Sequence, residues 1–428
     1  MTEPIGGGGL PERPTVGLLS PCGWGNLGDA AIQDVTIAAV RSRWPEARIV
    51  AFTSNPGDTR RRHGIAAFPL SGFERPAYSI AERPLPRSAA PIDRALQQLQ
   101  KIRGFWRAGG VARATSDFVQ SETLHWAMAR RWLREMDVLI VSGGGQLDDY
   151  WGGTWGHPYA LWKWTVLARR ARTPVLMLSV GMGTLRTALA RSFVRGALGR
   201  TAYRSFRDQR TRTRVSRLLG LSDAGPVVPD LAFGLESAPS RGGAQPAGIV
   251  GISPIAYCDP RVWPRKDAAV YQAYVARLAE LLGRLAAAGR RVVLFSTDGP
   301  DRVVMQDVWA AAGSPPSAER TCTETVADLF SALARIDVVV ASRLHGVILA
   351  QLAGCPVVAL SYDWKVAQHM DDVGQSAYCL DIDAFDVPGL AAALDGVESR
   401  RDELRVSLGR ELADRRRRVQ RQFDEVLR

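Results

Sequence analysis

The stretch that decides the fold is Ala341-Ser342-Arg343-Leu344-His345-Gly346, together with its flanks. Before it, residues 336–340 form an apolar run rich in valine, which predicts a buried strand. After it, residues 347–353 predict a helix closed by Gly354, and residues 357–362 predict a second strand. A strand, a helix and a strand in this order predict a right-handed crossover, with both strands parallel in one sheet.

Arg343 and His345 stand where the first strand ends and the helix begins. Ligands of open α/β sheets bind at that edge, and a helix start offers free backbone N–H groups to an anion. An arginine fork and a titratable imidazole in one turn suit a phosphate or a carboxylate. The alternative is structural: the arginine pairs with a buried acid and the histidine caps the turn. The spacing alone leaves both interpretations open.

Length and composition set the class of the protein. The 428 residues are enough for two or three domains, and a hydrophobic content of 46% is ordinary for a globular chain. No apolar run reaches the roughly 20 residues of a membrane span, and residues 1–10 lack a signal-peptide core. The five cysteines are scattered without metal-binding spacing, as is typical of free thiols in a reducing cytosol. We therefore expect a cytoplasmic protein with no metal.

The net charge of +12 favours anionic partners, namely phosphorylated substrates, an anionic membrane surface or nucleic acid. Zinc-finger and RNA-binding aromatic signatures are missing from the sequence, so we expect no nucleic-acid partner. Residues 72–116 combine many prolines and arginines with aromatic residues. Such a segment can make a peripheral contact with the inner face of a membrane, but a solvated loop or helical hairpin is the favoured interpretation.

A glycine-rich turn follows the first predicted strand, which covers residues 16–20. Its sequence, Gly23-Trp24-Gly25-Asn26-Leu27-Gly28, has the G-x-G-x-x-G form of a dinucleotide site. A dinucleotide site needs an acid at the end of the next strand, but residues 48–53 run into Thr53-Ser54-Asn55. The favoured interpretation is a turn that brings backbone and the side chains of Asn26 and Asp29 near a polar ligand.

A second glycine-rich turn, Gly143-Gly144-Gly145, follows the strand predicted over residues 137–141 and precedes Asp148. Consecutive glycines allow the backbone to approach a ligand closely. The tryptophans between residues 151 and 164 can stack on sugar rings, but they more often line a core or a groove. Arg207-Asp208 marks the end of another predicted strand.

Strands and helices alternate on both sides of a linker rich in Ser, Pro and Gly, which predicts two Rossmann-like, doubly wound α/β domains that face a cleft. The expected division is a disordered N-terminus at 1–13, an N-terminal domain at 14–236 with a basic insertion near 72–116, a linker at 237–247, a C-terminal domain at 248–397 that carries the donor-site motif, and a C-terminal helix at 398–428.

Three motifs together resemble the polysaccharide pyruvyl transferase family. They are residues 25–30, residues 143–149, and Ser342-Arg343-Leu344-His345 with the downstream Gly354-Cys355-Pro356-Val357-Val358 and Tyr362-Asp363. Arg207-Asp208 is a weaker fourth match, and residues 72–116 do not match. The resemblance implies two domains of the GT-B kind. It also implies transfer of the enolpyruvyl unit of phosphoenolpyruvate to a sugar of a glycan or its lipid-linked precursor, giving a cyclic ketal and phosphate.

This chemistry suggests roles for individual residues. Arg343 can clamp the phosphate or carboxylate of the donor, and His345 can protonate its C3 carbon as a general acid. Asp29 or Asp148 can accept a hydroxyl proton, although helix capping explains either acid equally well. The chemistry needs no cofactor besides the donor substrate. The expected substrate-binding residues are Asn26, Gly28, Asp29, Gly143, Gly144, Gly145, Asp148, Arg207, Ser342, Asp363 and Lys365.

Two other functions compete with this one. A nucleotide-sugar glycosyltransferase of the GT-B kind commonly places an acid for the ribose in the helix before the Gly-x-Pro-Val-Val strand, whereas this chain has no Asp or Glu between Gly346 and Pro356. A non-catalytic glycan-binding assembly subunit would be free to lose Arg343 and His345, and both are present.

Overall fold

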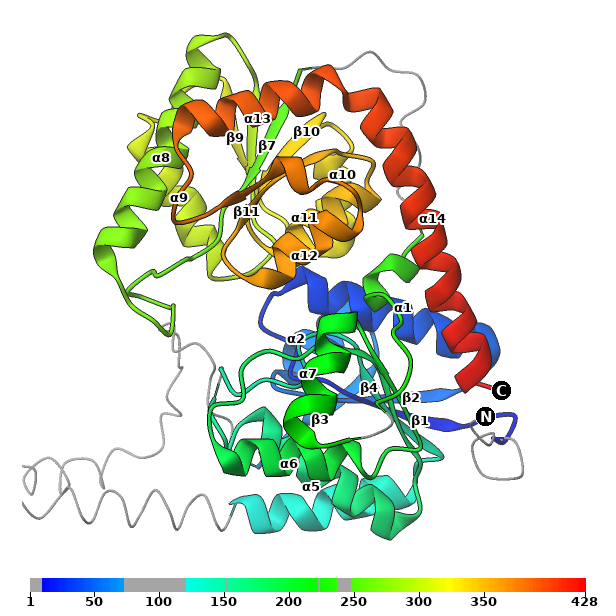
Figure 1. Ribbon diagram of the computed structural model, residues 1–428. Helices are drawn as coiled ribbons and strands as arrows, with labels where there is room; N and C mark the ends of the chain where they lie inside the picture. The colour runs from blue at the N-terminus through cyan, green and yellow to red at the C-terminus, as the bar shows by residue number, and fades with distance from the viewer. Residues whose placement is uncertain (1–9, 73–120, 151, 222–223, 237–247) are drawn as a thin grey trace, which may run out of the picture.

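The computed structural model describes residues 10–72, 121–150, 152–221, 224–236 and 248–428. The described residues form two separate parallel sheets of six strands, each flanked by helices, one above the other in Figure 1. This arrangement confirms the predicted pair of Rossmann-like α/β units. The predicted insertion at 72–116 and linker at 237–247 fall almost wholly outside the described residues, as does most of 1–13.

The N-terminal sheet has the order β3-β2-β1-β4-β5-β6. Its strands are β1 (Thr15–Leu19), β2 (Arg48–Thr53), β3 (Ala66–Pro69), β4 (Val138–Ser142), β5 (Val175–Val180) and β6 (Tyr203–Phe206). Its helices are α1 (Leu27–Arg43), α2 (Pro56–His63), a helix at 121–134, α5 (His157–Ala171), α6 (Ala188–Leu198), α7 (Gln209–Leu219) and the short 3₁₀ helix η1 (Leu231–Gly234).

The C-terminal sheet has the order β12-β11-β10-β7-β8-β9, which repeats the topology of the first. Its strands are β7 (Val250–Ser253), β8 (Val292–Phe295), β9 (Ala318–Thr321), β10 (Val338–Ala341), β11 (Val357–Ser361) and β12 (Cys379–Asp381). The helices are α8 (Ala268–Ala287), α9 (Asp301–Ala311), α10 (Val326–Leu333), α11 (Leu344–Leu352), α12 (Trp364–Asp372), η2 (Ser376–Tyr378), α13 (Val387–Ser399) and α14 (Arg401–Val426).

Chain order reverses at the same place in both sheets, between β1 and β4 and between β7 and β10. Ligands of doubly wound sheets bind at such switch points, beyond the carboxyl ends of the strands. The turn at residues 23–28 follows β1, the triple glycine follows β4, and Arg343 and His345 follow β10. The fold therefore places these three motifs at switch points, whereas Arg207-Asp208 follows the edge strand β6.

The central strands are apolar because both of their faces are covered. Every residue of β4, β5, β7, β8 and β10 is buried. Parallel strands buried on both faces appear in sequence as continuous apolar runs, which is why they could be predicted. Two element bounds need correction. The helix expected at 347–353 begins earlier, at Leu344, so His345 lies in its first turn. The helix expected from residue 398 begins at Arg401, because α13 continues to Ser399.

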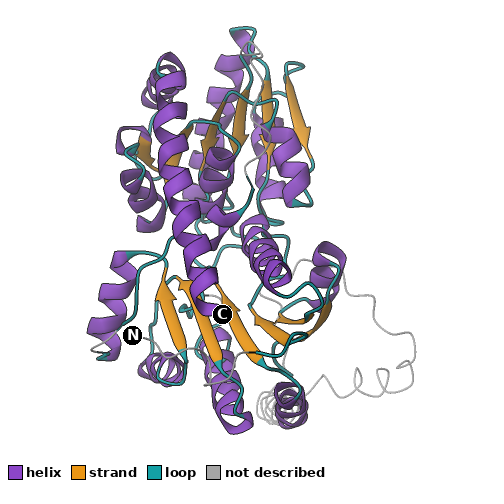
Figure 2. Ribbon diagram, turned by 90° about the vertical axis from the view of Figure 1, so that its right-hand side faces the viewer, coloured by secondary structure: helices purple, strands orange, loops and turns teal. Residues whose placement is uncertain are grey.

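The C-terminal helix α14 joins the two domains. It leaves the C-terminal domain and runs down the side of the molecule onto the N-terminal domain. Both views show that it spans the two domains (Figures 1 and 2). Phe423 is buried in the core there. The buried Gln422 donates to the Ser179 hydroxyl over 3.2 Å, and the Arg43 guanidinium donates to the Leu427 carbonyl over 3.0 Å. The helix thus fixes one domain against the other.

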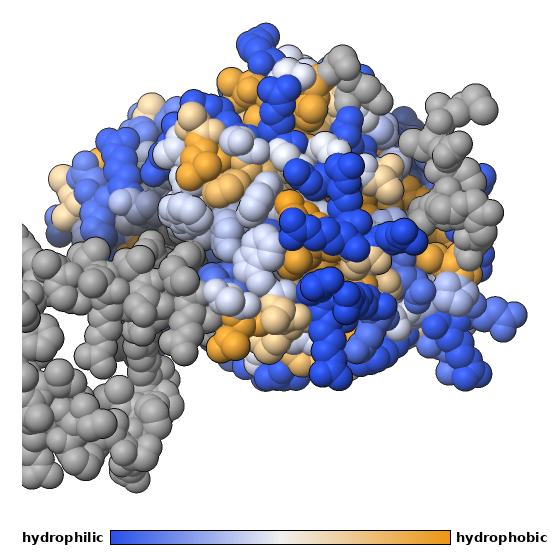
Figure 3. Space-filling view, turned by 90° about the horizontal axis from the view of Figure 1, so that it is seen from below, coloured by the Kyte–Doolittle hydropathy of each residue, from blue (hydrophilic) through white to orange (hydrophobic). Residues whose placement is uncertain are grey.

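The outer face of the N-terminal domain, seen from below in Figure 3, mixes hydrophobic and hydrophilic residues. Leu124, Met128 and Leu189 are exposed apolar residues of helices in this domain. Within the described part of the chain, none of the helices has the length and apolar character needed to cross a bilayer.

Removing the Phe423 side chain tests the docking of α14. Phe423→Ala should lower the free energy of unfolding by about 3 kcal/mol, because a buried aromatic residue is replaced by a cavity. Urea denaturation followed by circular dichroism measures this change. Arg421→Ala, two residues away on the exposed face of the same helix, should change stability by less than about 0.5 kcal/mol. Equal effects of both substitutions would contradict the docking.

Candidate functional site

The two switch points face each other across a cleft of about 450 Å³. Most residues predicted for the site lie on its wall. The predicted residues on the wall are Asn26, Asp29, Gly145, Asp148, Arg207, Arg343, His345 and Lys365. Gly28, Gly143, Gly144, Ser342 and Asp363 are not on the wall, and each has a structural role next to it, as described below.

The turn after β1 carries the N-terminal wall and meets the other domain. Asn26 caps α1, and its side-chain oxygen accepts from the N–H groups of Gly28 and Asp29 at 2.9 and 3.1 Å. The Leu27 N–H donates to the Thr297 carbonyl across the interface at 2.8 Å. Burial raises the pKa of the Asp29 carboxyl above its usual range, against an opposing effect of His345. The first turn of α1 is therefore held against the C-terminal domain.

The triple glycine mainly shapes the backbone. Gly143 and Gly144 have φ angles of +44° and +70°, which side chains disfavour, and a Cβ on Gly143 would lie 3.0 Å from Ile32 of α1. The glycines thus let α1 pack close to the end of β4. Farther along the chain, the Asp148 carboxylate packs against Gly183, because a Cβ on Gly183 would be only 1.5 Å from Asp148 Oδ2. Burial raises the pKa of Asp148.

Arg343 lines the cleft, but two acids of the same domain hold its guanidinium. It donates to both carboxylate oxygens of Asp301, with Nη2 at 2.9 Å from Oδ1, and Nη2 is also 3.0 Å from Asp298 Oδ2. These contacts match the structural interpretation of Arg343, in which the arginine pairs with buried acids. A donor anion would have to compete with two carboxylates for this guanidinium, so Arg343 is poorly placed to act as the main clamp.

His345 faces an acid that belongs to the other domain. Its Nε2 lies 3.4 Å from Oδ2 of Asp230, a residue with an exposed fraction of 2%. Arg207 Nη1 donates to the same oxygen at 3.3 Å. Although burial alone would raise it, the pKa of Asp230 is held well below its usual range by His345 and Arg207. Asp230 is thus a buried, ionised carboxylate that faces the His345 imidazole.

Gly28 provides the space for this imidazole. A Cβ on Gly28 would lie 2.0 Å from both Cγ and Nδ1 of His345. Residues with a Cβ therefore cannot occupy position 28 unless the imidazole or α1 moves. Gly28 acts by letting the first turn of α1 approach His345.

The remaining predicted residues hold elements in place. The buried Ser342 hydroxyl bonds the Tyr274 hydroxyl at 2.9 Å. Asp363 caps α12 by accepting from the Lys365 N–H at 3.2 Å, and its carboxylate lies 3.5 Å from Lys365 Nζ. Lys365 itself lines the cleft.

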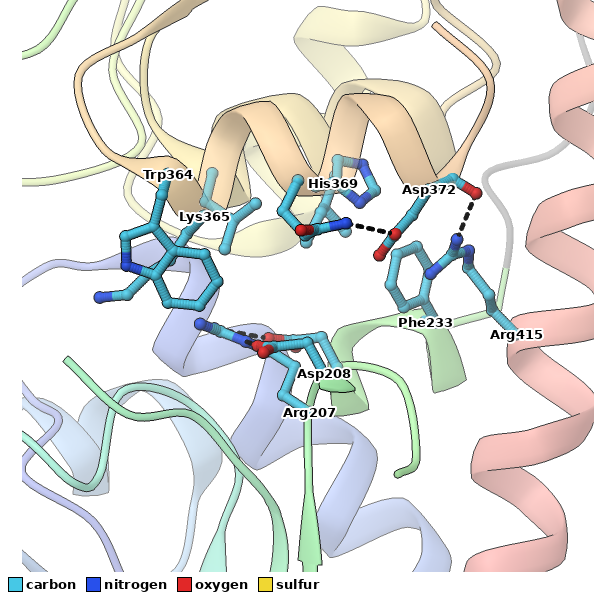
Figure 4. A pocket seen from close by; sticks show the side chains of 12 residues that line it. Arg207, Asp208, Phe233, Trp364, Lys365, His369, Asp372 and Arg415 are labelled. Atoms are coloured by element: carbon cyan, nitrogen blue, oxygen red, sulfur yellow. Dashed lines mark hydrogen bonds and ion pairs between the residues drawn. The ribbon is translucent and has the colours of Figure 1, made fainter. Parts of the chain in front are cut away.

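A smaller cavity of about 40 Å³ adjoins the cleft and shares Arg207, Leu344 and Lys365 with it. Figure 4 shows its walls: α12 on one side, Arg207 and Asp208 on the other, and Arg415 of α14 at the end. A volume of this size holds a few water molecules and is too small for a sugar.

Sequence reasoning missed three acids of the site: Asp230, Asp298 and Asp301. Asp230 is the one acid in the otherwise apolar run from Val227 to Phe233, and that isolation was a usable signal. Asp298 and Asp301 flank the start of α9, where helix capping is the usual explanation of an acid. In the described residues no cluster of three or more His, Cys, Asp and Glu has the geometry of a metal site.

Comparisons with known proteins agree with this architecture. The family model for polysaccharide pyruvyl transferase matches residues 26–363. A search of curated protein sequences finds no significant match.

Solved structures with a similar fold have little sequence in common with the chain. Anabaena Alr3699/HepE in complex with UDP has a TM-score of 0.55 at 15% identity, over 96% of this chain and 99% of that one. The UDP-GlcNAc 2-epimerase of Neisseria meningitidis bound to UDP-GlcNAc has a TM-score of 0.56 at 8% identity, with the same coverage. At such identities the likeness establishes the fold alone.

Substituting Gly28 tests the packing against His345. Gly28→Ala should lower the free energy of unfolding by about 1–3 kcal/mol, because the new methyl group overlaps the imidazole. Chemical denaturation measures the loss, and a crystal structure of the variant should show a displaced His345 or a shifted α1. Gly283→Ala in α8, where a Cβ meets no atom within 4 Å, is the matched control and should be neutral or stabilising. An unchanged stability of Gly28→Ala with His345 in place would contradict the close packing of Gly28 against His345.

Proposed function

We propose that this chain, which belongs to the polysaccharide pyruvyl transferase family, transfers the enolpyruvyl unit of phosphoenolpyruvate to two hydroxyls of a glycan sugar. The products are a pyruvate ketal and phosphate. The observation that carries the proposal is the pairing of His345 with the ionised Asp230 at the cleft, at a distance of 3.4 Å. The reaction requires a proton on C3 of the donor, and a histidine that faces a carboxylate at the cleft can supply it.

The donor carries a phosphate and a carboxylate, and the cleft offers groups that bind anions. Arg207 makes single contacts of 3.3 and 3.6 Å with acids, and Lys365 makes one at 3.5 Å; all are looser than those of Arg343. The start of α11 has no side-chain cap, so its first N–H groups are free to bind an anion. We assign donor binding to Arg207, Lys365 and this helix start.

The make-up of α11 argues against a nucleotide sugar as the donor. Residues 346–352 are all buried and include no acid, and the side-chain oxygen of the polar Gln351 accepts from His369 Nε2 at 2.6 Å. A ribose therefore has no carboxylate on this helix to bind. The Anabaena protein is in complex with UDP in its crystal structure, and this binding is a statement about that protein alone.

In the proposed reaction, bonds form and break in a definite sequence. His345 gives a proton to C3, and C2 becomes an electrophile that resembles an oxocarbenium ion. One sugar hydroxyl forms a bond to C2, the bond from C2 to the phosphate oxygen breaks, and the second hydroxyl closes the ketal. Two hydroxyl protons are released: one restores His345 and the other leaves with phosphate.

The proposal is tested by replacing His345. His345→Gln keeps a hydrogen-bonding side chain of similar size but cannot deliver the proton, so kcat should fall by about a hundredfold or more while the KM for phosphoenolpyruvate stays nearly constant. Phosphate release from phosphoenolpyruvate with a panel of p-nitrophenyl hexopyranosides measures both, and mass spectrometry identifies the ketal.

The matched control is His63→Gln. His63 also pairs with a carboxylate, that of Asp34 at 2.7 Å, but it does not line the cleft. This variant should turn over at the wild-type rate. A His345→Gln enzyme with near-normal kcat, or one that loses donor affinity but not rate, would contradict the assignment of His345 as the acid.

A further inference from the structure

We propose that Asp298 is the base of this site, and that it takes the proton of the acceptor hydroxyl that attacks first. The inference rests on the proposed function and names a residue that neither the sequence motifs nor the family likeness pointed to. It places the reacting hydroxyl of the sugar on the C-terminal wall of the cleft, next to the end of β8.

The position of Asp298 suits this role. It follows β8 by three residues and lines the cleft, with an exposed fraction of only 4%. Its Oδ2 is 3.0 Å from Arg343 Nη2. Its Oδ1 is buried and has no hydrogen-bond partner among the residues that the structure describes. A buried carboxylate oxygen without a partner is costly unless a ligand completes it, and a sugar hydroxyl is a suitable donor.

The charges around Arg343 show which acid takes the proton. One guanidinium faces two carboxylates, so the cluster has one negative charge too many. Asp301 binds Arg343 through both oxygens and also accepts from the Ala256 N–H at 2.9 Å. Asp298 contacts Arg343 through one oxygen only. Protonation of Asp298 therefore leaves a neutral ion pair and removes the excess charge.

The electrostatic surroundings support the same assignment. Burial raises the pKa of Asp298 to about 7, with Asp301 and Asp29 acting in the same direction and Arg343 and the Gly299 amide acting against it. A base is most effective when its pKa lies near the working pH, because it is then largely ionised and still holds a proton well.

The proton transfers balance. The O–H bond of the first hydroxyl breaks, its proton goes to Asp298 Oδ1, and its electron pair forms the bond to C2. The phosphate oxygen takes the electron pair of the broken C2–O bond, and the proton on Asp298 passes to the departing phosphate. The second hydroxyl gives its proton back to His345. Asp298 and His345 both return to their starting protonation states, and no other reactant is needed.

Asp298→Asn tests the proposal, because an amide can still accept from Arg343 but cannot take a proton. We expect kcat to fall about a hundredfold or more, with thermal stabilisation by phosphoenolpyruvate retained. The wild-type rate should rise with pH through about 7 as Asp298 ionises, and this rise should be absent from the variant. Asp301→Asn also alters the contacts of Arg343 but is off the cleft wall, so any activity it retains should keep the rise.

Asp259→Asn is the matched control, because Asp259 is a buried acid paired with Arg261 outside the cleft. It should leave kcat unchanged. The assignment would be overturned by an Asp298→Asn enzyme that turns over within about threefold of the wild type and keeps the acidic limb of the pH profile. A wild-type enzyme that releases no phosphate with the hexopyranoside panel would instead contradict the proposed function, and the base assignment with it.

Discussion

The close contact between the first turn of α1 and the first turn of α11 sets the geometry of the whole site. Gly28 leaves room for the His345 imidazole, and the Leu27 N–H binds the Thr297 carbonyl of the opposite domain. Because the two helix starts meet, His345 reaches Asp230, which belongs to the N-terminal domain. The acid of the proposed reaction and the carboxylate that faces it therefore come from different domains, and the site exists only when the domains are together.

The cleft combines charges in two groups of different function. Arg343, Asp298 and Asp301 form a tight cluster within the C-terminal domain, whereas Arg207, Asp230 and His345 form a looser one across the interface. Short bidentate contacts fix orientation and leave little capacity to bind a substrate. Longer single contacts leave donors available to a ligand. This difference is the reason for assigning donor binding to Arg207 rather than to Arg343. The base is assigned to Asp298 because its Oδ1 has no hydrogen-bond partner among the described residues.

The sequence predicted what depends on burial and on chain order. The central strands are buried and mostly apolar, and within each domain the motifs follow strands whose carboxyl ends share one edge of the sheet. With two such domains facing a cleft, the convergence of the motifs could be foreseen. The edge strands β3, β9 and β12 could not, because they are short and partly exposed, and β3 ends in a proline.

The partners of the site residues were also beyond the sequence. Nothing in the spacing says that Arg343 is held by Asp298 and Asp301, more than 40 residues upstream. Nor does it say that Asp230 of one domain faces a histidine of the other. Such contacts depend on how loops from separate strands meet in space. Of the two interpretations of Arg343 that the sequence left open, only the packed structure could favour one.

The most direct test of the account is isothermal titration calorimetry of the wild-type protein with phosphoenolpyruvate and, in parallel, with UDP. The account predicts saturable binding of about one phosphoenolpyruvate per chain, weakened at least about tenfold in Lys365→Met by loss of a charged contact, and no measurable binding of UDP at the same concentrations. Saturable binding of UDP together with no binding of phosphoenolpyruvate would contradict it.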